Sequence, residues 1–152
     1  MKRFKLQIKL VFFAPLFILT WLLFAFSCKK SSQVDSIPSV PVNLTVPLSL
    51  PQYSALNAIG NHVNINGGYK GIIIYRRTLD QFVAFERACP YDPTTSGAIV
   101  EADSSGILVV DRHCGSKFNL FDGSVVNGPA TRGLKPYNVD YDSGTQTLYI
   151  YN

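Results

Sequence analysis

The most specific stretch of the sequence runs from residue 115 to residue 130 and reads GSKFNLFDGSVVNGPA. It contains two short segments with strand character, residues 117–121 and 124–126, on either side of Asp122-Gly123. Asp-Gly is a strong hairpin signal because both turn positions tolerate a positive φ angle. The stretch therefore predicts two antiparallel strands joined by a two-residue turn.

Outward from this hairpin, the chain beyond residue 42 keeps the same character. Short apolar or alternating segments are separated by turn residues, and no segment after residue 52 has a helical period. Strands are expected at residues 42–50, 63–65, 72–75, 82–86, 107–110, 137–141 and 147–151, with one helical turn within 54–59 and a second tight turn at Ser143-Gly144. Pro47 and Pro51 place the first strand at a sheet edge. We predict an all-β domain, an antiparallel sandwich or barrel of about nine short strands.

Composition limits the function classes. Of 152 residues, 47% are hydrophobic and 16% charged, enough for one apolar core and too apolar for a disordered chain. The net charge of +4 comes from Lys2, Arg3, Lys5 and Lys9, because the ten later Lys and Arg balance the ten Asp and Glu. No basic patch remains to bind nucleic acid. The sequence also has no phosphate loop, no nucleophile with a nearby base and no paired-carboxylate signature, so no enzyme is expected.

Residues 1–27 are predicted to form an export signal. Four positive residues precede 17 uncharged ones, and the apolar run ends in Ala-Phe-Ser directly before Cys28. A small residue before a cysteine at this place resembles the lipobox of bacterial lipoproteins, which implies cleavage before Cys28 and a lipid on its thiol. The alternative is an uncleaved transmembrane helix, although 17 residues are short for a bilayer span and Pro15 interrupts them.

Residues 28–41 are rich in Ser and Pro and predict an extended, lipid-anchored tether, which leaves residues 42–152 for the β domain. The membrane is then a partner through the N-terminal lipid. Asp35 is the first acidic residue after Cys28. This late position favours the periplasmic face of a bacterial membrane over the cell surface.

The stretch at 115–130 closely resembles the second half of a Rieske iron–sulfur domain. In that family a cluster loop ends in His-Gly-Ser, a strand containing Phe and an Asp-Gly hairpin follow, and a Gly-Pro-Ala loop covers the cluster. The covering loop here is Gly128-Pro129-Ala130, and Cys89-Pro90-Tyr91 resembles the first cluster loop. The resemblance spans about residues 55–151 and implies a Rieske-like β domain with two cluster-binding loops.

The ligand positions of this family are altered. A Rieske [2Fe–2S] cluster is held by two Cys and two His, one of each from each loop. Carried over by position, the first loop gives Cys89 for Cys and Tyr91 for His, and the second gives Asp111 for Cys and Cys114 for His. Only Cys89 is kept in type, and phenolate and carboxylate are harder ligands than the groups they replace. The resemblance therefore implies a domain that has lost its [2Fe–2S] cofactor.

Three states stay open for the cysteines that remain once Cys28 carries lipid. In an exported protein, an even pair on two facing loops favours a Cys89–Cys114 disulfide that replaces the crosslink of the cluster. A mononuclear metal held by Cys89, Asp111, His113 and Cys114 is the second possibility. Two free thiols are the third.

Two functions follow from these alternatives. The first is a non-enzymatic interaction or structural module with an unidentified protein partner. The second is a Rieske-type electron-transfer protein that keeps an altered [2Fe–2S] or mononuclear metal site. The charged pairs Arg76-Arg77 and Glu86-Arg87 are expected to be solvated strand positions, with a docking role as the alternative.

Overall fold

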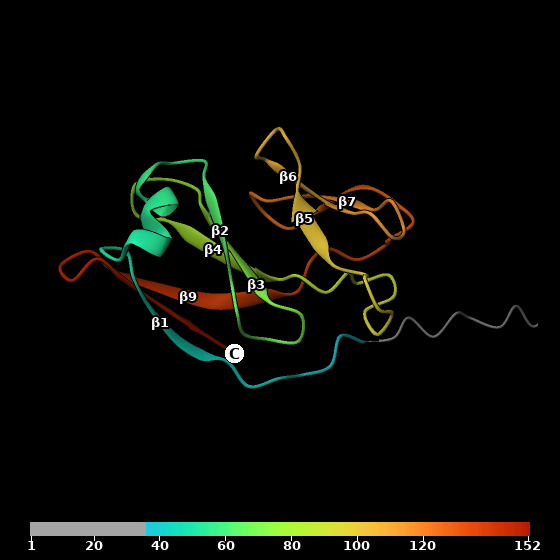
Figure 1. The fold of residues 1–152 in the computed structure, drawn as a ribbon, viewed down its shortest axis with the longest axis horizontal. Coiled ribbons are helices and arrows are strands. Elements are labelled where there is room, and N and C mark those ends of the chain that lie inside the picture. Colours follow the sequence, from blue (N-terminus) through green and yellow to red (C-terminus); the bar gives the residue numbers. More distant parts are fainter. Residues whose placement is uncertain (1–35) are drawn as a thin grey trace, which may run out of the picture. The chain divides into compact units, whose positions relative to one another are not determined.

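The computed structural model of the protein describes residues 36–152 (Figure 1). The predicted export signal at residues 1–27, the lipid site Cys28 and the first part of the tether lie outside the described residues. Residues 36–41, the last part of the tether, contain no helix or strand. Between residues 36 and 152 no helix has both the length and the apolar character that a bilayer span needs.

The described fold is all-β, as predicted, with one short 3₁₀ helix. Its elements are β1 (Asn43–Pro47), η1 (Pro51–Asn57), β2 (His62–Ile65), β3 (Ile72–Arg76), β4 (Phe82–Glu86), β5 (Val100–Ala102), β6 (Leu108–Asp111), β7 (Lys117–Asn119), β8 (Val125–Asn127), β9 (Pro136–Asp142) and β10 (Thr147–Tyr151). The sequence does not predict β5, because its three residues are too few to show an alternating pattern.

The larger sheet contains six antiparallel strands in the order β1-β10-β9-β4-β3-β2. Strand β1 lies at its edge, as Pro47 predicts, and pairs with β10 so that Val46 is opposite Leu148. The apolar side chains of this sheet enclose a first core together with the 3₁₀ helix. Its buried members include Val46, Leu56, Ile72, Ile74, Phe82, Leu148 and Ile150.

The smaller sheet contains four antiparallel strands in the order β5-β6-β7-β8 (Figure 1). A second core lies between this sheet and the β3–β4 hairpin, and it includes Ile73, Tyr75, Phe85, Val100, Val109, Phe118 and Leu120. Strand β3 supplies both cores, because successive side chains of a strand point to opposite faces. This explains the uninterrupted apolar run at residues 72–75, which an edge strand with one wet face would not show.

The predicted turn at Asp122-Gly123 is longer than two residues. Strands β7 and β8 are joined by residues 120–124. The Asn119 side-chain oxygen accepts a hydrogen bond from the Phe121 N–H at 2.8 Å, and the Asp122 carboxylate accepts one from the Ser124 N–H at 2.9 Å. These two local side-chain turns lengthen the connection. Gly123 still takes the positive φ, +76°, that the Asp-Gly signal requires.

The turn predicted at Ser143-Gly144 is also longer, and strands β9 and β10 are joined by residues 143–146. The Asp142 carboxylate accepts hydrogen bonds from the N–H of Gly144 at 2.9 Å and from the hydroxyl of Thr145 at 2.7 Å. The positive φ of this connection, +52°, falls on Gln146. Asp142 thus organises the turn in place of a two-residue hairpin.

Glu86 is not a solvated strand position, contrary to the expectation from the sequence. Its side chain is fully buried. One carboxylate oxygen accepts hydrogen bonds from the Tyr69 N–H and the Tyr137 hydroxyl, both at 2.7 Å. The other accepts from the N–H groups of Lys70 at 2.9 Å and Ala88 at 3.0 Å. Four donors make the buried carboxylate tolerable, and burial together with the bond to Glu86 raises the pKa of Tyr137.

Arg76 is likewise not a free surface residue. Its guanidinium donates hydrogen bonds to the carbonyl oxygens of Leu56 at 2.9 Å and Asn57 at 3.0 Å, and it lies 5.1 Å from the ring centre of Phe82. These carbonyls belong to the last turn of η1, where a cation is favourable. The helix itself begins at Pro51, earlier than the predicted residues 54–59, because proline suits the first turn of a helix.

Candidate functional site

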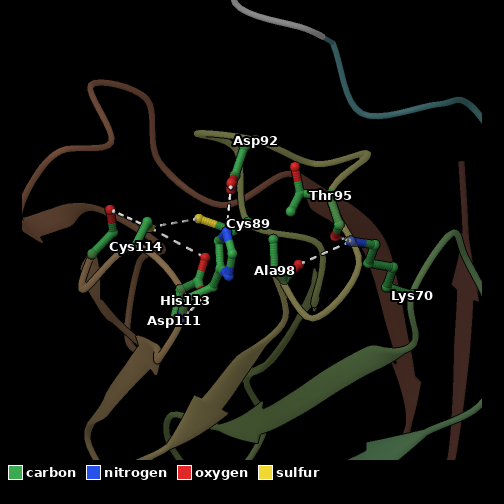
Figure 2. Close-up of polar contacts among 9 residues, drawn as sticks. Lys70, Cys89, Asp92, Thr95, Ala98, Asp111, His113 and Cys114 are labelled. Carbon is green, nitrogen blue, oxygen red and sulfur yellow. Dashed lines mark hydrogen bonds and ion pairs between the residues drawn. The ribbon is translucent and has the colours of Figure 1, made fainter.

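Two loops bring the candidate residues together. The first loop, residues 87–99, connects β4 to β5 and carries Cys89 and Asp92. The second, residues 112–116, connects β6 to β7 and carries Cys114, directly after Asp111 at the end of β6. The side chains of the two loops converge in Figure 2. Strand pairing sets this convergence, because Val100, directly after the first loop, is opposite Asp111, directly before the second.

Cys89 and Cys114 face each other with their Sγ atoms 3.6 Å apart. Both are free thiols, so the disulfide predicted from the sequence, which needs a sulfur–sulfur bond of about 2.05 Å, is not formed in this structure. The Cys114 thiol instead donates to Asp111 Oδ2 at 3.2 Å and lies 3.1 Å from Ser116 Oγ. Burial, followed by the hydrogen bond with Asp111, raises the pKa of the Cys89 thiol, which keeps it protonated in the absence of a cation.

Asp111 is fully buried and shapes the second loop. Its Oδ1 accepts a hydrogen bond from the His113 N–H at 2.8 Å. Its backbone carbonyl accepts one from the Gly115 N–H at 2.8 Å, and its N–H donates to the Ser116 carbonyl at 2.9 Å. Gly115 has a φ of +80°, which explains the glycine in the Gly-Ser pair. One carboxylate oxygen therefore fixes the backbone, and the other points at Cys114.

The structure adds Asp92 to the candidate residues, which the sequence analysis missed. The ligand atoms of Cys89, Asp92, Asp111 and Cys114 all lie within 4.8 Å of one another. His113, predicted as a ligand, is outside this group, and its Nε2 lies 3.6 Å from Asp92 Oδ2. A single acid among the polar residues of this loop gave no signal in the sequence that distinguishes it from a solvated residue.

Asp92 also has an unsatisfied atom. Its Oδ1 is buried and has no hydrogen-bond partner. Among the side-chain oxygens and nitrogens of residues 36–152, it is the one buried atom in this state. A buried polar atom in this state costs free energy unless some other group satisfies it. By contrast Tyr91, at a predicted former ligand position, is 48% exposed and is not part of the group.

The loop predicted to cover the site reaches the second loop. Its peptide bond between Gly128 and Pro129 is cis, and Ala130 is buried. The Ala130 N–H donates to Ser116 Oγ at 2.9 Å, and this oxygen is the one that contacts the Cys114 sulfur. Gly128-Pro129-Ala130 is therefore connected to the cysteine pair through a single serine side chain.

Lys70 holds the other side of the first loop (Figure 2). Its ammonium group donates to the carbonyl oxygens of Thr95 at 2.5 Å and Ala98 at 3.2 Å. The Ala98 carbonyl also accepts a hydrogen bond from the Cys89 N–H at 3.2 Å. Because the backbone N–H of Lys70 binds Glu86, this one residue connects the buried glutamate to the loop that carries Cys89 and Asp92.

Comparison with solved structures identifies the fold. The plasma membrane Rieske protein PetC3 from the cyanobacterium Synechocystis PCC 6803 superposes with a TM-score of 0.52 at 18% identity, over 72% of this chain and 97% of that one. The ferredoxin of carbazole 1,9a-dioxygenase from Nocardioides aromaticivorans IC177 gives a TM-score of 0.47 at 13% identity, over 74% and 97%. No protein-family model and no curated protein matches the sequence. The domain is therefore Rieske-like in fold, as the motif at residues 115–130 predicts.

The side chains at the site do not match the ligand set of a Rieske cluster. That cluster needs two imidazole nitrogens on one of its irons, and no imidazole is in the group of four described residues. Its ligands are also separated by the width of a two-iron cluster, whereas the four atoms here lie within 4.8 Å of one another. The compact group, with two sulfurs and two carboxylates, has the size and donor types of a site for a single ion.

Proposed function

We propose that the protein is an exported, lipid-anchored Rieske-like module that works without a [2Fe–2S] cluster and is not an enzyme. Its role is to interact with, or to support, another protein at a bacterial membrane, on the periplasmic face. The observation that carries the proposal is the content of the four former ligand positions. Tyr91 lies toward solvent, Asp111 offers a carboxylate whose Oδ1 holds the second loop, and neither position offers the ligand that the cluster requires.

The hydrogen bonds that hold the two loops in place support a structural role for this region. Lys70 holds the first loop, Asp111 shapes the second, and Ser116 connects the second to Ala130. A buried network of this kind keeps a surface in one conformation, which a protein that binds a partner requires. The fold alone does not carry the proposal, because one fold hosts unrelated functions.

An electron carrier with an altered cluster is the competing function, and the metal content separates the two. The full chain is produced in iron-replete, anaerobic bacteria and extracted from the membrane with detergent. We expect colourless protein without stoichiometric iron or acid-labile sulfide. A coloured sample that gives, after reduction, the low-average-g electron paramagnetic resonance signal of a mixed Cys/His cluster would establish electron transfer instead.

The anchor is tested by metabolic labelling with a fatty-acid analogue. The wild-type chain is expected to carry the label and Cys28→Ser to lose it, because the lipid is attached to that thiol. Cys114→Ser is the matched control, since it also removes one thiol and leaves the anchor in place. Equal labelling of the wild type and Cys28→Ser, or an intact N-terminus by mass spectrometry, contradicts the lipoprotein assignment.

A further inference from the structure

We propose that Cys89, Asp92, Asp111 and Cys114 form a four-ligand site for one divalent metal ion, and that zinc is the ion it binds. This inference rests on the proposed function, because it requires the position of the two-iron cluster to be free. The first loop contributes Cys89 and Asp92, and the end of β6 and the second loop contribute Asp111 and Cys114 (Figure 2). An ion bound by all four therefore joins the two loops.

The distances suit a tetrahedral ion. Two thiolates at about 2.3 Å from one tetrahedral zinc lie roughly 3.8 Å apart. The sulfurs of Cys89 and Cys114 are 3.6 Å apart, much closer to this value than to a disulfide bond. A thiolate and a carboxylate oxygen on the same ion are separated by roughly 3.5 Å, and Cys114 Sγ lies 3.2 Å from Asp111 Oδ2. The four ligand atoms lie within 4.8 Å of one another, so an ion draws the more widely separated pairs closer together.

The hydrogen bonds of the two aspartates leave one carboxylate oxygen of each available to bind the ion. Asp111 uses Oδ1 to hold the His113 N–H, so Oδ2 can turn from the Cys114 thiol to the ion. Asp92 has Oδ2 near the His113 imidazole, while Oδ1 is buried without a partner. A bound ion gives Asp92 Oδ1 the partner that the protein does not provide.

Binding is balanced by the release of protons. The ion forms two bonds to sulfur and two to oxygen, and the two thiol protons leave for solvent as the thiolates form. Two thiolates with two carboxylates are a donor set that zinc accepts. Because protein atoms fill all four positions, no place remains for a reacting water, and the ion has a structural role.

His113 is a positioning residue in this arrangement. Its imidazole is half exposed, and its Nε2 lies 3.6 Å from Asp92 Oδ2, the oxygen other than the buried and unpartnered Oδ1. A contact of this kind orients a ligating carboxylate, and its loss typically weakens metal affinity 10- to 100-fold. The histidine predicted as a ligand from the sequence thus acts through Asp92.

The test uses the full chain in detergent, reduced and stripped of metal by a chelator. Zinc is then titrated against a chromophoric competitor, and cobalt is used as a spectroscopic replacement. We expect one zinc per chain and an intense sulfur-to-cobalt absorption band. His113→Gln is expected to weaken zinc binding about 10-fold with the cobalt band retained, and Asp92→Asn to weaken it more, because it removes a ligand. Asp80→Asn, an exposed acid on the β3–β4 turn, is the control and should bind as wild type.

The outcomes separate this inference from the proposed function. Reduced chain that binds no zinc, or binds it equally well with Asp92→Asn and Cys114→Ser, overturns the metal site and leaves the cluster-free module standing. Chain isolated with a Cys89–Cys114 disulfide that zinc does not prevent also overturns it. Stoichiometric iron with sulfide overturns the proposed function and the zinc site together.

Discussion

Two regions of the molecule contain buried carboxylate oxygens, and their hydrogen bonding differs. Around Glu86, three backbone N–H groups and the Tyr137 hydroxyl satisfy both carboxylate oxygens. Between the two loops, Asp92 has a buried oxygen with no partner, and the thiols of Cys89 and Cys114 face each other. The first region is complete with protein atoms alone, whereas the second contains a carboxylate oxygen that no protein atom satisfies.

This difference separates a structural charge from a binding site. A buried carboxylate whose donors are all internal stabilises one conformation and has nothing left to bind. A buried polar atom without a hydrogen-bond partner costs free energy. A bound ion that pairs with this atom removes the cost, which favours binding. The four predictions below test this contrast, beginning with the largest expected effect.

Glu86→Gln is expected to lower the free energy of unfolding by about 3 kcal/mol, because one acceptor oxygen becomes an amide that faces two buried donors. Chemical denaturation followed by circular dichroism measures the change. Glu101→Gln is the control: this residue is exposed and pairs with Arg112 across 3.4 Å at the surface, so its loss should cost less than about 0.5 kcal/mol. Similar losses for the two variants would contradict a special role for Glu86.

Zinc is expected to stabilise the reduced chain by about 2.7 kcal/mol when its free concentration is 100 times the dissociation constant. Melting temperature with and without zinc measures this effect. Glu86→Gln, which keeps all four ligands, should show the same zinc-dependent shift as the wild type, whereas Asp92→Asn should show little. A shift that disappears with Glu86→Gln would mean that the two regions are not independent.

Gly68→Ala is expected to cost about 2 kcal/mol, through both backbone strain and a clash. Gly68 has a φ of +63°, and an added Cβ would lie 2.4 Å from Glu86 Oε2 and from the Tyr137 hydroxyl. Gly97→Ala is the matched control, since its φ is +84° and no atom lies within 4 Å of the added Cβ. Thermal unfolding should give a smaller loss for Gly97→Ala, roughly 1 kcal/mol from strain alone. Equal losses would show that Gly68 makes no essential contact with Glu86.

Asp92→Asn in the metal-free chain has the smallest expected effect, a change in unfolding free energy within about 0.5 kcal/mol. The reason is that the replaced carboxylate has one unpartnered oxygen and one long contact with His113. The comparison with Glu86→Gln is direct because both changes convert an acid to its amide. A loss as large as that of Glu86→Gln would indicate that protein atoms already satisfy Asp92.

The sequence predicts the fold well and the site in part. Alternation, turn residues and the motif at residues 115–130 identify an all-β, Rieske-like domain and the edge position of β1. They place three of the four grouped side chains on facing loops: Cys89, Asp111 and Cys114. They fail for Asp92, because a single acid in a loop rich in polar residues has no pattern that distinguishes it from a solvated one.

What the sequence determined by itself was local: where strands alternate, where turns require Gly, and which residue types replace the cluster ligands at Tyr91, Asp111 and Cys114. The tertiary structure alone decided which polar side chains are buried. Glu86 is followed by Arg87 and appears solvated in the sequence, but Tyr69 and Tyr137, 17 and 51 residues away, supply its donors. The free energy of a buried charge depends on the donors that surround it in space, and the spacing of residues along the chain does not record them.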